Sequence, residues 1–139
     1  MNHHDHKSFE QRRIAIFEPH ECFVTNPSLV CLAESLGNCG ALVDLLIPDS
    51  DCYPPSDCGV SRYPFPGQLS HEASSIRTTL RRWWERVRLI RVDRMFTAGG
   101  YDLIIGVDSA GIIKGYEYAK RFEVPLVYMS FEIFFHDEL

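Results

Sequence analysis

The sequence predicts an α/β fold with a single doubly wound, Rossmann-like parallel sheet. Short apolar runs, most of them closed by proline or by small and acidic residues, alternate along the chain with stretches of helical periodicity. Strands that alternate with helices are typical of βαβ units, which build parallel sheets. The 139 residues, 45% of them hydrophobic and 24% charged, suffice for one domain with a buried core. Strands are expected near Ile14, Val43, Tyr63, Ile104 and Val127.

The first third of the chain predicts a strand, a helix and a second strand. The run RRIAIFEP (12–19) has the profile of a buried strand, and ALVDLLIP (41–48) repeats it. Between them, Asn26 can cap a helix and Pro27 suits its first turn. Gly37 or Gly40 is expected to end this helix. Its apolar residues recur at helical spacing, at Leu29, Leu32, Ala33 and Leu36.

The segment 49–70 differs in character from the rest of the chain. It holds four of the eight prolines, and only residues 60–65 suit a short strand. A connection of this length in a small domain is usually functional or mobile, although an insertion tolerated at the surface is the simpler interpretation.

Residues 75–96 predict a long helix rich in arginine. Apolar residues follow helical spacing along one stripe, and arginines flank this stripe on both sides. We expect the stripe to face the sheet and the arginines to lie in solvent. The stripe consists of Ile76, Leu80, Trp83, Val87 and Ile90, and the surface arginines are Arg77, Arg81, Arg82, Arg86 and Arg88.

The charge of this helix contrasts with that of the rest of the chain. Seven arginines within residues 76–94 stand against Glu85 and Asp93, which gives a formal charge of +5. The whole chain carries −5, so the remainder carries −10. The arginines either form a solvated face or a patch for an anionic membrane surface or phosphate. Nucleic acid is not an expected partner, because aromatic residues are not interleaved on the basic faces and the chain is acidic overall.

The last third of the chain predicts a second βαβ unit. A buried strand at 103–107 gives way to Asp108, Ser109 and Gly111, which open a helix that runs to Phe122. The run EVPLVYMS (123–130) is the next strand.

Polar and mostly acidic residues follow the predicted strands. In doubly wound sheets, ligands bind in the crevice outside the carboxyl ends of the strands. An acidic rim suits a hydroxyl-rich ligand such as a sugar better than the phosphates of a nucleotide, because carboxylates accept hydrogen bonds and repel anions. For Asp108 and Ser109 helix capping is the alternative role, and Glu132 fits a solvated loop equally well. The candidate binding residues are Glu18, His20, Asp108, Ser109 and Glu132, with Asp49, Asp51 and Ser130 nearby on the same rim.

No catalytic constellation stands out in the sequence. It contains no G-x-G-x-x-G after the first strand, no P-loop, no G-x-S-x-G and no set of residues at metal-ligand spacing, so neither a metal nor a cofactor is expected. Residues 1–12 are predicted to be a disordered polar tail, whose histidines fit a frayed end better than a metal site. The five cysteines form no C-x-x-C pair and are expected to be reduced thiols.

The stretch DLIIGVDSAGIIKGYEYAKRFEVPLVYMSFEIFFHDEL (102–139) resembles the closing part of the amino-terminal domain of GT-B glycosyltransferases of the group-1 type. The strand-helix-strand at 12–48 resembles the opening of the same domain, although it lacks the paired glycine that many members carry after the first strand. The ending that carries most of the resemblance comprises Val124, Pro125, Val127, Tyr128, Ser130 and Glu132.

The resemblance implies that residues 13–139 form the acceptor-side domain of such an enzyme. It implies a nucleotide-sugar donor, bound mainly by a second domain, and a sugar or lipid-linked acceptor. It also implies that the chain alone is inactive and that HDEL (136–139), which spells a retention signal of the endoplasmic reticulum, is an internal stretch in related proteins. A location in the cytoplasm, including the periphery of the membrane, is expected because no secretory signal opens the chain. The alternative is a stand-alone binding module or a receiver-like signalling domain, for which Glu18 and Asp108 would be the acidic cluster.

Overall fold

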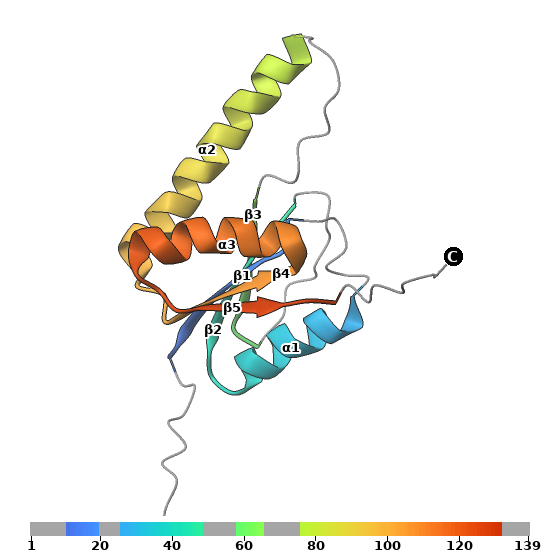
Figure 1. Ribbon diagram of the computed structural model, residues 1–139, viewed down its shortest axis with the longest axis vertical. Coiled ribbons are helices and arrows are strands. Elements are labelled where there is room, and N and C mark those ends of the chain that lie inside the picture. Colours follow the sequence, from blue (N-terminus) through green and yellow to red (C-terminus); the bar gives the residue numbers. More distant parts are fainter. Residues whose placement is uncertain (1–10, 20–25, 49–57, 66–75, 132–139) are drawn as a thin grey trace, which may run out of the picture.

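The computed structural model describes residues 11–19, 26–48, 58–65 and 76–131, with the backbone alone over 76–82. Its elements are β1 (Arg13–Phe17), α1 (Pro27–Asn38), β2 (Leu42–Ile47), β3 (Val60–Pro64), α2 (Ile76–Gly99), β4 (Leu103–Val107), α3 (Asp108–Phe122) and β5 (Leu126–Met129). The five strands form one parallel sheet in the order β3-β2-β1-β4-β5 (Figure 1). The predicted α/β class and all five predicted strand positions are confirmed, and the order is that of a Rossmann-like sheet.

Helices cover both faces of the sheet. Because side chains alternate along a strand, Ile14 and Ile16 of β1 point to one face, whereas Ala15 and Phe17 point to the other. The first face packs against α1 through Leu29 and other residues of that helix. The second face packs against α2 and α3 and is rich in aromatic rings. Its buried members are Ala15, Phe17, Leu46, Phe65, Val92, Phe96, Tyr101, Ile104, Tyr118 and Ala119.

The start of α1 follows the sequence closely. The side chain of Asn26 accepts a hydrogen bond from the backbone N–H of Leu29 at 3.2 Å, and Pro27 is the first helical residue. The helix ends at Asn38, and Gly40 then adopts a φ of +89°, which lets the chain turn into β2. The predicted cap at Asn26 and the predicted glycine turn at Gly40 are therefore both present in the fold.

The orientation predicted for α2 is wrong. Trp83 is 57% exposed, Ile90 is 51% exposed and Val87 is 38% exposed, so the described part of the apolar stripe does not face the sheet. The helix instead buries Val92 and Phe96 at its carboxyl-terminal end. In Figure 1 only this end approaches α3 and the sheet, while the amino-terminal half projects away from the domain. The side chains of Ile76 and Leu80 lie outside the described residues.

Aromatic packing explains why α2 faces the domain with Val92 and Phe96 and not with the apolar stripe. The ring of Phe96 lies 4.3 Å from that of Tyr101 and 4.7 Å from that of Tyr118, measured between centroids. Aromatic side chains bury large areas and gain from such tilted contacts, so the burial of Phe96 decides which side of α2 faces the domain. The periodicity of the whole helix did not indicate that α2 contacts the domain mainly through its last two turns.

The two edges of the sheet differ in their cover. β3 pairs with β2 over its whole length. It ends at Pro64, because proline cannot donate a hydrogen bond to a sheet ladder. On β5, at the opposite edge, Val127 is 48% exposed and Tyr128 is 52% exposed. Among the described helices none is both long and apolar enough to cross a membrane.

Candidate functional site

The strand order of the sheet reverses between β1 and β4, which are neighbours although a helix-strand-strand-helix segment separates them in the chain. Phe17 at the end of β1 lies opposite Gly106 of β4, so Glu18 and Asp108 follow adjacent strand ends. This reversal is the topological switch point at which open α/β sheets bind their ligands. Two of the predicted site residues, Glu18 and Asp108, therefore follow neighbouring strands at the switch point.

Two glycines let α3 start close against these strand ends. A Cβ on Gly111 would lie 2.3 Å from the carbonyl oxygen of Phe17, and one on Gly106 would lie 2.7 Å from Cα of Ile112. Real Cβ atoms do not approach other atoms so closely, so both positions require glycine unless the backbone shifts. The first turn of α3 consequently rests directly on the end of β1.

Asp108 does not cap its own helix. It is the first residue of α3 and has a left-handed φ of +50°, a conformation that Asp tolerates better than most residues. Its Oδ1 accepts a hydrogen bond from the backbone N–H of Phe131 at 2.8 Å. The carboxylate thus ties the chain that leaves β5 to the start of α3. The helix-capping alternative for this residue is wrong.

The other predicted residues of the rim differ in what the structure says of them. Glu18 is buried, with 1% exposure, and its backbone N–H donates to the carbonyl oxygen of Leu46. Ser109 is exposed on the first turn of α3, and no side chain caps this turn at Val107. His20, Asp49, Asp51 and Glu132 lie outside the described residues.

The predicted arginine patch is only partly described. Arg86 is exposed and Arg88 is half-buried, whereas the side chains of Arg77, Arg81 and Arg82 lie outside the described residues. At the other end of the same helix, Arg91 lies 5.7 Å above the ring of Tyr63.

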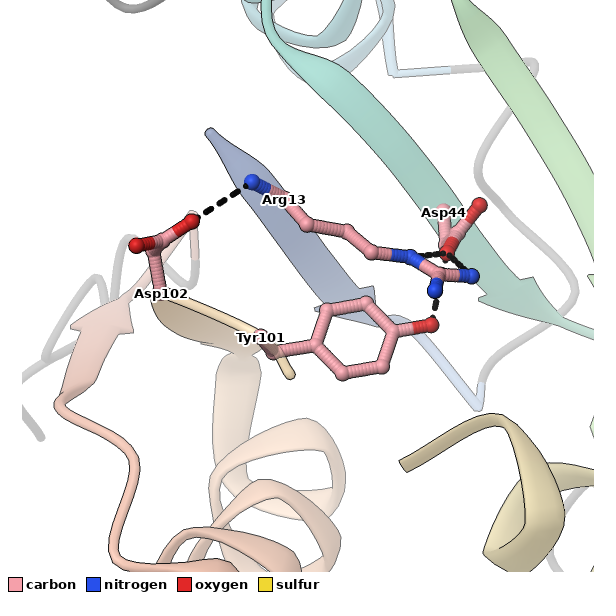
Figure 2. A network of polar contacts seen from close by, with 4 residues as sticks. All are labelled: Arg13, Asp44, Tyr101 and Asp102. Carbon is pink, nitrogen blue, oxygen red and sulfur yellow. Dashed lines mark hydrogen bonds and ion pairs between the residues drawn. The ribbon is translucent and has the colours of Figure 1, made fainter. Parts of the chain in front are cut away.

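A buried polar network, missed by the sequence reading, lies at the amino ends of the strands (Figure 2). We call it the Asp44 network; its members are Arg13, Asp44, Tyr101 and Asp102. Asp44 of β2 is 5% exposed and accepts hydrogen bonds from Nε of Arg13 at 2.9 Å and from the hydroxyl of Tyr101 at 2.6 Å. The guanidinium of Arg13 also lies 4.7 Å above the Tyr101 ring. Asp102 accepts from the backbone N–H of Arg13 at 2.9 Å and pairs with Arg12.

These contacts shift the pKa values of the Asp44 network in different directions. Burial is the largest influence on Arg13 and lowers its pKa, but the charge of Asp44, the neighbouring Tyr101 and the hydrogen bond to Asp44 together outweigh it, so the pKa is raised. Burial, reinforced by the hydrogen bond to Asp44, raises the pKa of Tyr101, so this phenol stays neutral. The hydrogen bond from the backbone of Arg13, followed by that from Arg12, lowers the pKa of Asp102. These contacts therefore favour the charged forms of Arg13 and Asp102 and the neutral form of Tyr101.

One signal in the sequence could have revealed this network. Asp44 interrupts the apolar run LVDLLI, and a carboxylate in the middle of a buried strand needs a partner. The neighbouring strand supplies Arg13 as its first residue, and Ala15, two residues on, pairs with Asp44. The Asp44 network lies at the amino ends of the strands, whereas ligands of such sheets bind at the carboxyl ends. Its position therefore indicates a structural role.

A cavity of about 210 Å³ lies between α2 and α3, away from the predicted rim. Asp93 is part of its lining. The carboxylate of Asp93 accepts a hydrogen bond from the hydroxyl of Tyr118 at 2.9 Å and pairs with Arg121 at 3.3 Å. Its charged groups thus have partners within the cavity wall. The lining residues are Phe65, Leu89, Asp93, Lys114, Glu117, Tyr118 and Arg121.

Comparison with known proteins bears on the fold alone. No protein-family model matches the chain, and no curated protein matches it either. Among solved structures, the chain is similar to the C-terminal domain (residues 78–226) of a hydrogenase from Pyrococcus furiosus. The identity is 16%, the match covers 88% of this chain and 92% of that one, and the TM-score is 0.50. This likeness agrees with an α/β Rossmann-like domain.

The topology also bears on the receiver-like alternative. Receiver domains share the flavodoxin-like order 2-1-3-4-5, whereas β3 here extends the sheet beyond β2 and gives the order 3-2-1-4-5. The carboxylate of Asp108 is buried and hydrogen-bonded to Phe131. Both observations speak against a receiver with Asp108 as the phosphorylated residue.

Proposed function

We propose that this chain is the acceptor-side domain of a GT-B type glycosyltransferase. The observation that carries the proposal is that Glu18, Asp108 and Ser109 follow the neighbouring strands β1 and β4 at the switch point. The resemblance of residues 102–139 to that family supports the same assignment. In this function a sugar moves from a nucleotide-sugar donor to a sugar or lipid-linked acceptor.

The chemistry of the rim favours hydroxyl groups as ligands. Ser109 supplies an exposed hydroxyl on the first turn of α3, and beside it Asp108 places a carboxylate that is buried and accepts through Oδ1 from the backbone N–H of Phe131. Carboxylate and hydroxyl groups can bond a sugar hydroxyl as acceptor or donor, whereas a phosphate would meet the charge of Asp108. By this proposal the nucleotide of the donor is held mainly by a second domain, and the reaction takes place in the cytoplasm, at or near a membrane when the acceptor is lipid-linked.

The test is an NMR titration of the ¹⁵N-labelled chain with a panel of mono- and oligosaccharides and, separately, with nucleotides and nucleotide sugars. Sugars should shift the amide signals of Gly106, Ser109, Gly111 and Phe131, which surround the strand ends. Ser109→Ala should weaken sugar binding about fivefold, the value of one hydrogen bond of about 1 kcal/mol.

The matched control is Ser61→Ala, which removes another exposed hydroxyl, from β3 at the edge of the sheet. It should leave sugar binding unchanged. If nucleotides shift these amides and no sugar does, the stand-alone binding module becomes the better account. Stable labelling of Asp108 by acetyl phosphate would instead revive the receiver.

A further inference from the structure

The outward side of α2 carries an apolar stripe that the domain leaves uncovered. Trp83, Val87 and Ile90 follow each other at spacings of four and three residues, and Trp84 lies beside them with 56% exposure. Val92 and Phe96, the buried residues of the helix, lie on the opposite side of the cylinder at 100° per residue. Among the described residues nothing packs over this stripe, and the half of α2 that bears it projects from the body (Figure 1).

The spacing is that of a seam between packed helices. Steps of three and four residues place side chains in one narrow row, as at the a and d positions of a coiled coil. In the sequence the same steps run back from Trp83 to Leu80 and Ile76, so the row spans about four turns. Past Ile90 the next position of the row is Arg94, which ends it. In the sequence the row therefore has the length and pattern of a short helix-packing surface, and Trp83, Val87 and Ile90 are its described, exposed part.

Positive charge borders this row. Arg86 lies on one side and Arg91 on the other, both exposed, and Arg94 stands at its end. In helix pairs the residues beside the apolar seam select the partner by charge. A second copy of α2 would bring arginines against arginines, so the charge pattern opposes self-association through this row. Acidic residues on a partner would pair with all three.

From this geometry we propose that α2 docks an amphipathic helix of a partner protein, one whose apolar seam is bordered by Asp and Glu. The docking surface consists of Trp83, Trp84, Val87 and Ile90 with Arg86, Arg91 and Arg94. A narrow row bordered by charge fits a helix better than a membrane, because helices that lie on lipid present a broad apolar face. This surface is independent of the rim at the switch point and of the sugar chemistry proposed there.

The two tryptophans make the surface directly measurable. Trp83 and Trp84 are the two tryptophans of the sequence, so the intrinsic fluorescence of the chain reports on this row. The probe is a synthetic helical peptide of about three heptads with Leu and Ile along its seam and Glu beside it. Its binding should shift tryptophan emission to the blue, and added salt should weaken it. A peptide with the same seam but Lys in place of Glu should bind at least about tenfold more weakly.

Two sets of variants test the surface itself. Val87→Glu with Ile90→Glu should abolish the emission shift, whereas Ile113→Glu, on the 60% exposed Ile113 of α3, should leave it unchanged. Arg86→Glu with Arg94→Glu should reverse the preference in favour of the Lys peptide. Circular dichroism of each variant checks that the helix content is unchanged.

Three results would overturn the proposal. Equal binding of the two peptides would show contact without charge recognition. A blue shift with phosphatidylglycerol vesicles and none with the Glu peptide would assign the row to an anionic membrane. A blue shift that grows with protein concentration alone, together with a dimer in sedimentation, would assign it to a second copy.

Discussion

At the scale of single residues, Asp44 stabilises the fold through a buried set of polar contacts. It lies within a strand whose other inner residues are apolar, and it satisfies Arg13 and Tyr101 together. Gly99 at the end of α2 leaves room for the guanidinium, since a Cβ there would lie 2.0 Å from Nη1 of Arg13. The network thus joins β1, β2 and the turn into β4 at the amino ends of the strands.

Asp44→Asn should lower the free energy of unfolding by about 2 kcal/mol, because it removes the charge that Arg13 and Tyr101 share in a buried site. Tyr101→Phe should cost about 1 kcal/mol, because Asp44 keeps its contact with Arg13. Urea unfolding of both variants and of the double variant measures these costs. Costs that simply add in the double variant would mean that the two side chains act separately.

Asp102 gives the Asp44 network a dependence on acid pH. Its pKa is lowered in the folded state, so its charged form contributes stability above its unfolded pKa of about 4, and this contribution is lost as the pH falls through the folded value. Asp102→Asn should therefore be less stable than the unaltered chain at pH 7, with the difference narrowing below about pH 4. Unfolding by urea at several pH values measures it. A difference that stays constant with pH would show that the charge has no part in it.

At the scale of elements, α2 is held by one end. Phe96 contacts Phe17, Tyr101, Tyr118 and Phe122, whereas Ile90 on the outer side is half exposed. Phe96→Ala should lower the free energy of unfolding by about 3–4 kcal/mol, and Ile90→Ala should change it by less than about 0.5 kcal/mol. Thermal unfolding followed by circular dichroism compares the two. Similar losses would place Ile90 in the core, as the apolar periodicity first indicated.

The sequence predicted elements better than it predicted their faces. Asn26 and Pro27 mark the start of α1 by local chemistry, and prolines mark the ends of the first two strands, so these features could be read directly. The rotation of α2 depends on Tyr101 and Tyr118, which lie later in the chain and meet Phe96 only in the folded domain. The bond from Phe131 to Asp108 likewise joins two segments whose approach no local pattern encodes. The placement of Glu18 and Asp108 at one edge of the sheet was predictable, because parallel strands all end at the same edge.

At the scale of the whole molecule, the sheet forms one Rossmann-like unit with a single switch point among the described strands. The proposed function divides donor and acceptor between two such units. We therefore expect the purified 139-residue chain to transfer no sugar from any radiolabelled nucleotide sugar, even to an acceptor that it binds. Turnover by the chain alone, in a preparation from a host that lacks its own transferases for that donor, would contradict this assignment.

The hydrogen bond between Asp108 and Phe131 links the crevice to the segment that leaves β5. By the proposed function, a sugar that takes the Oδ1 lone pairs of Asp108 competes with the backbone N–H of Phe131. By thermodynamic linkage the reverse holds with equal free energy: whatever holds Phe131 on Asp108 weakens a sugar that needs the same oxygen. The amide signal of Phe131 then reports on sugar binding at Asp108.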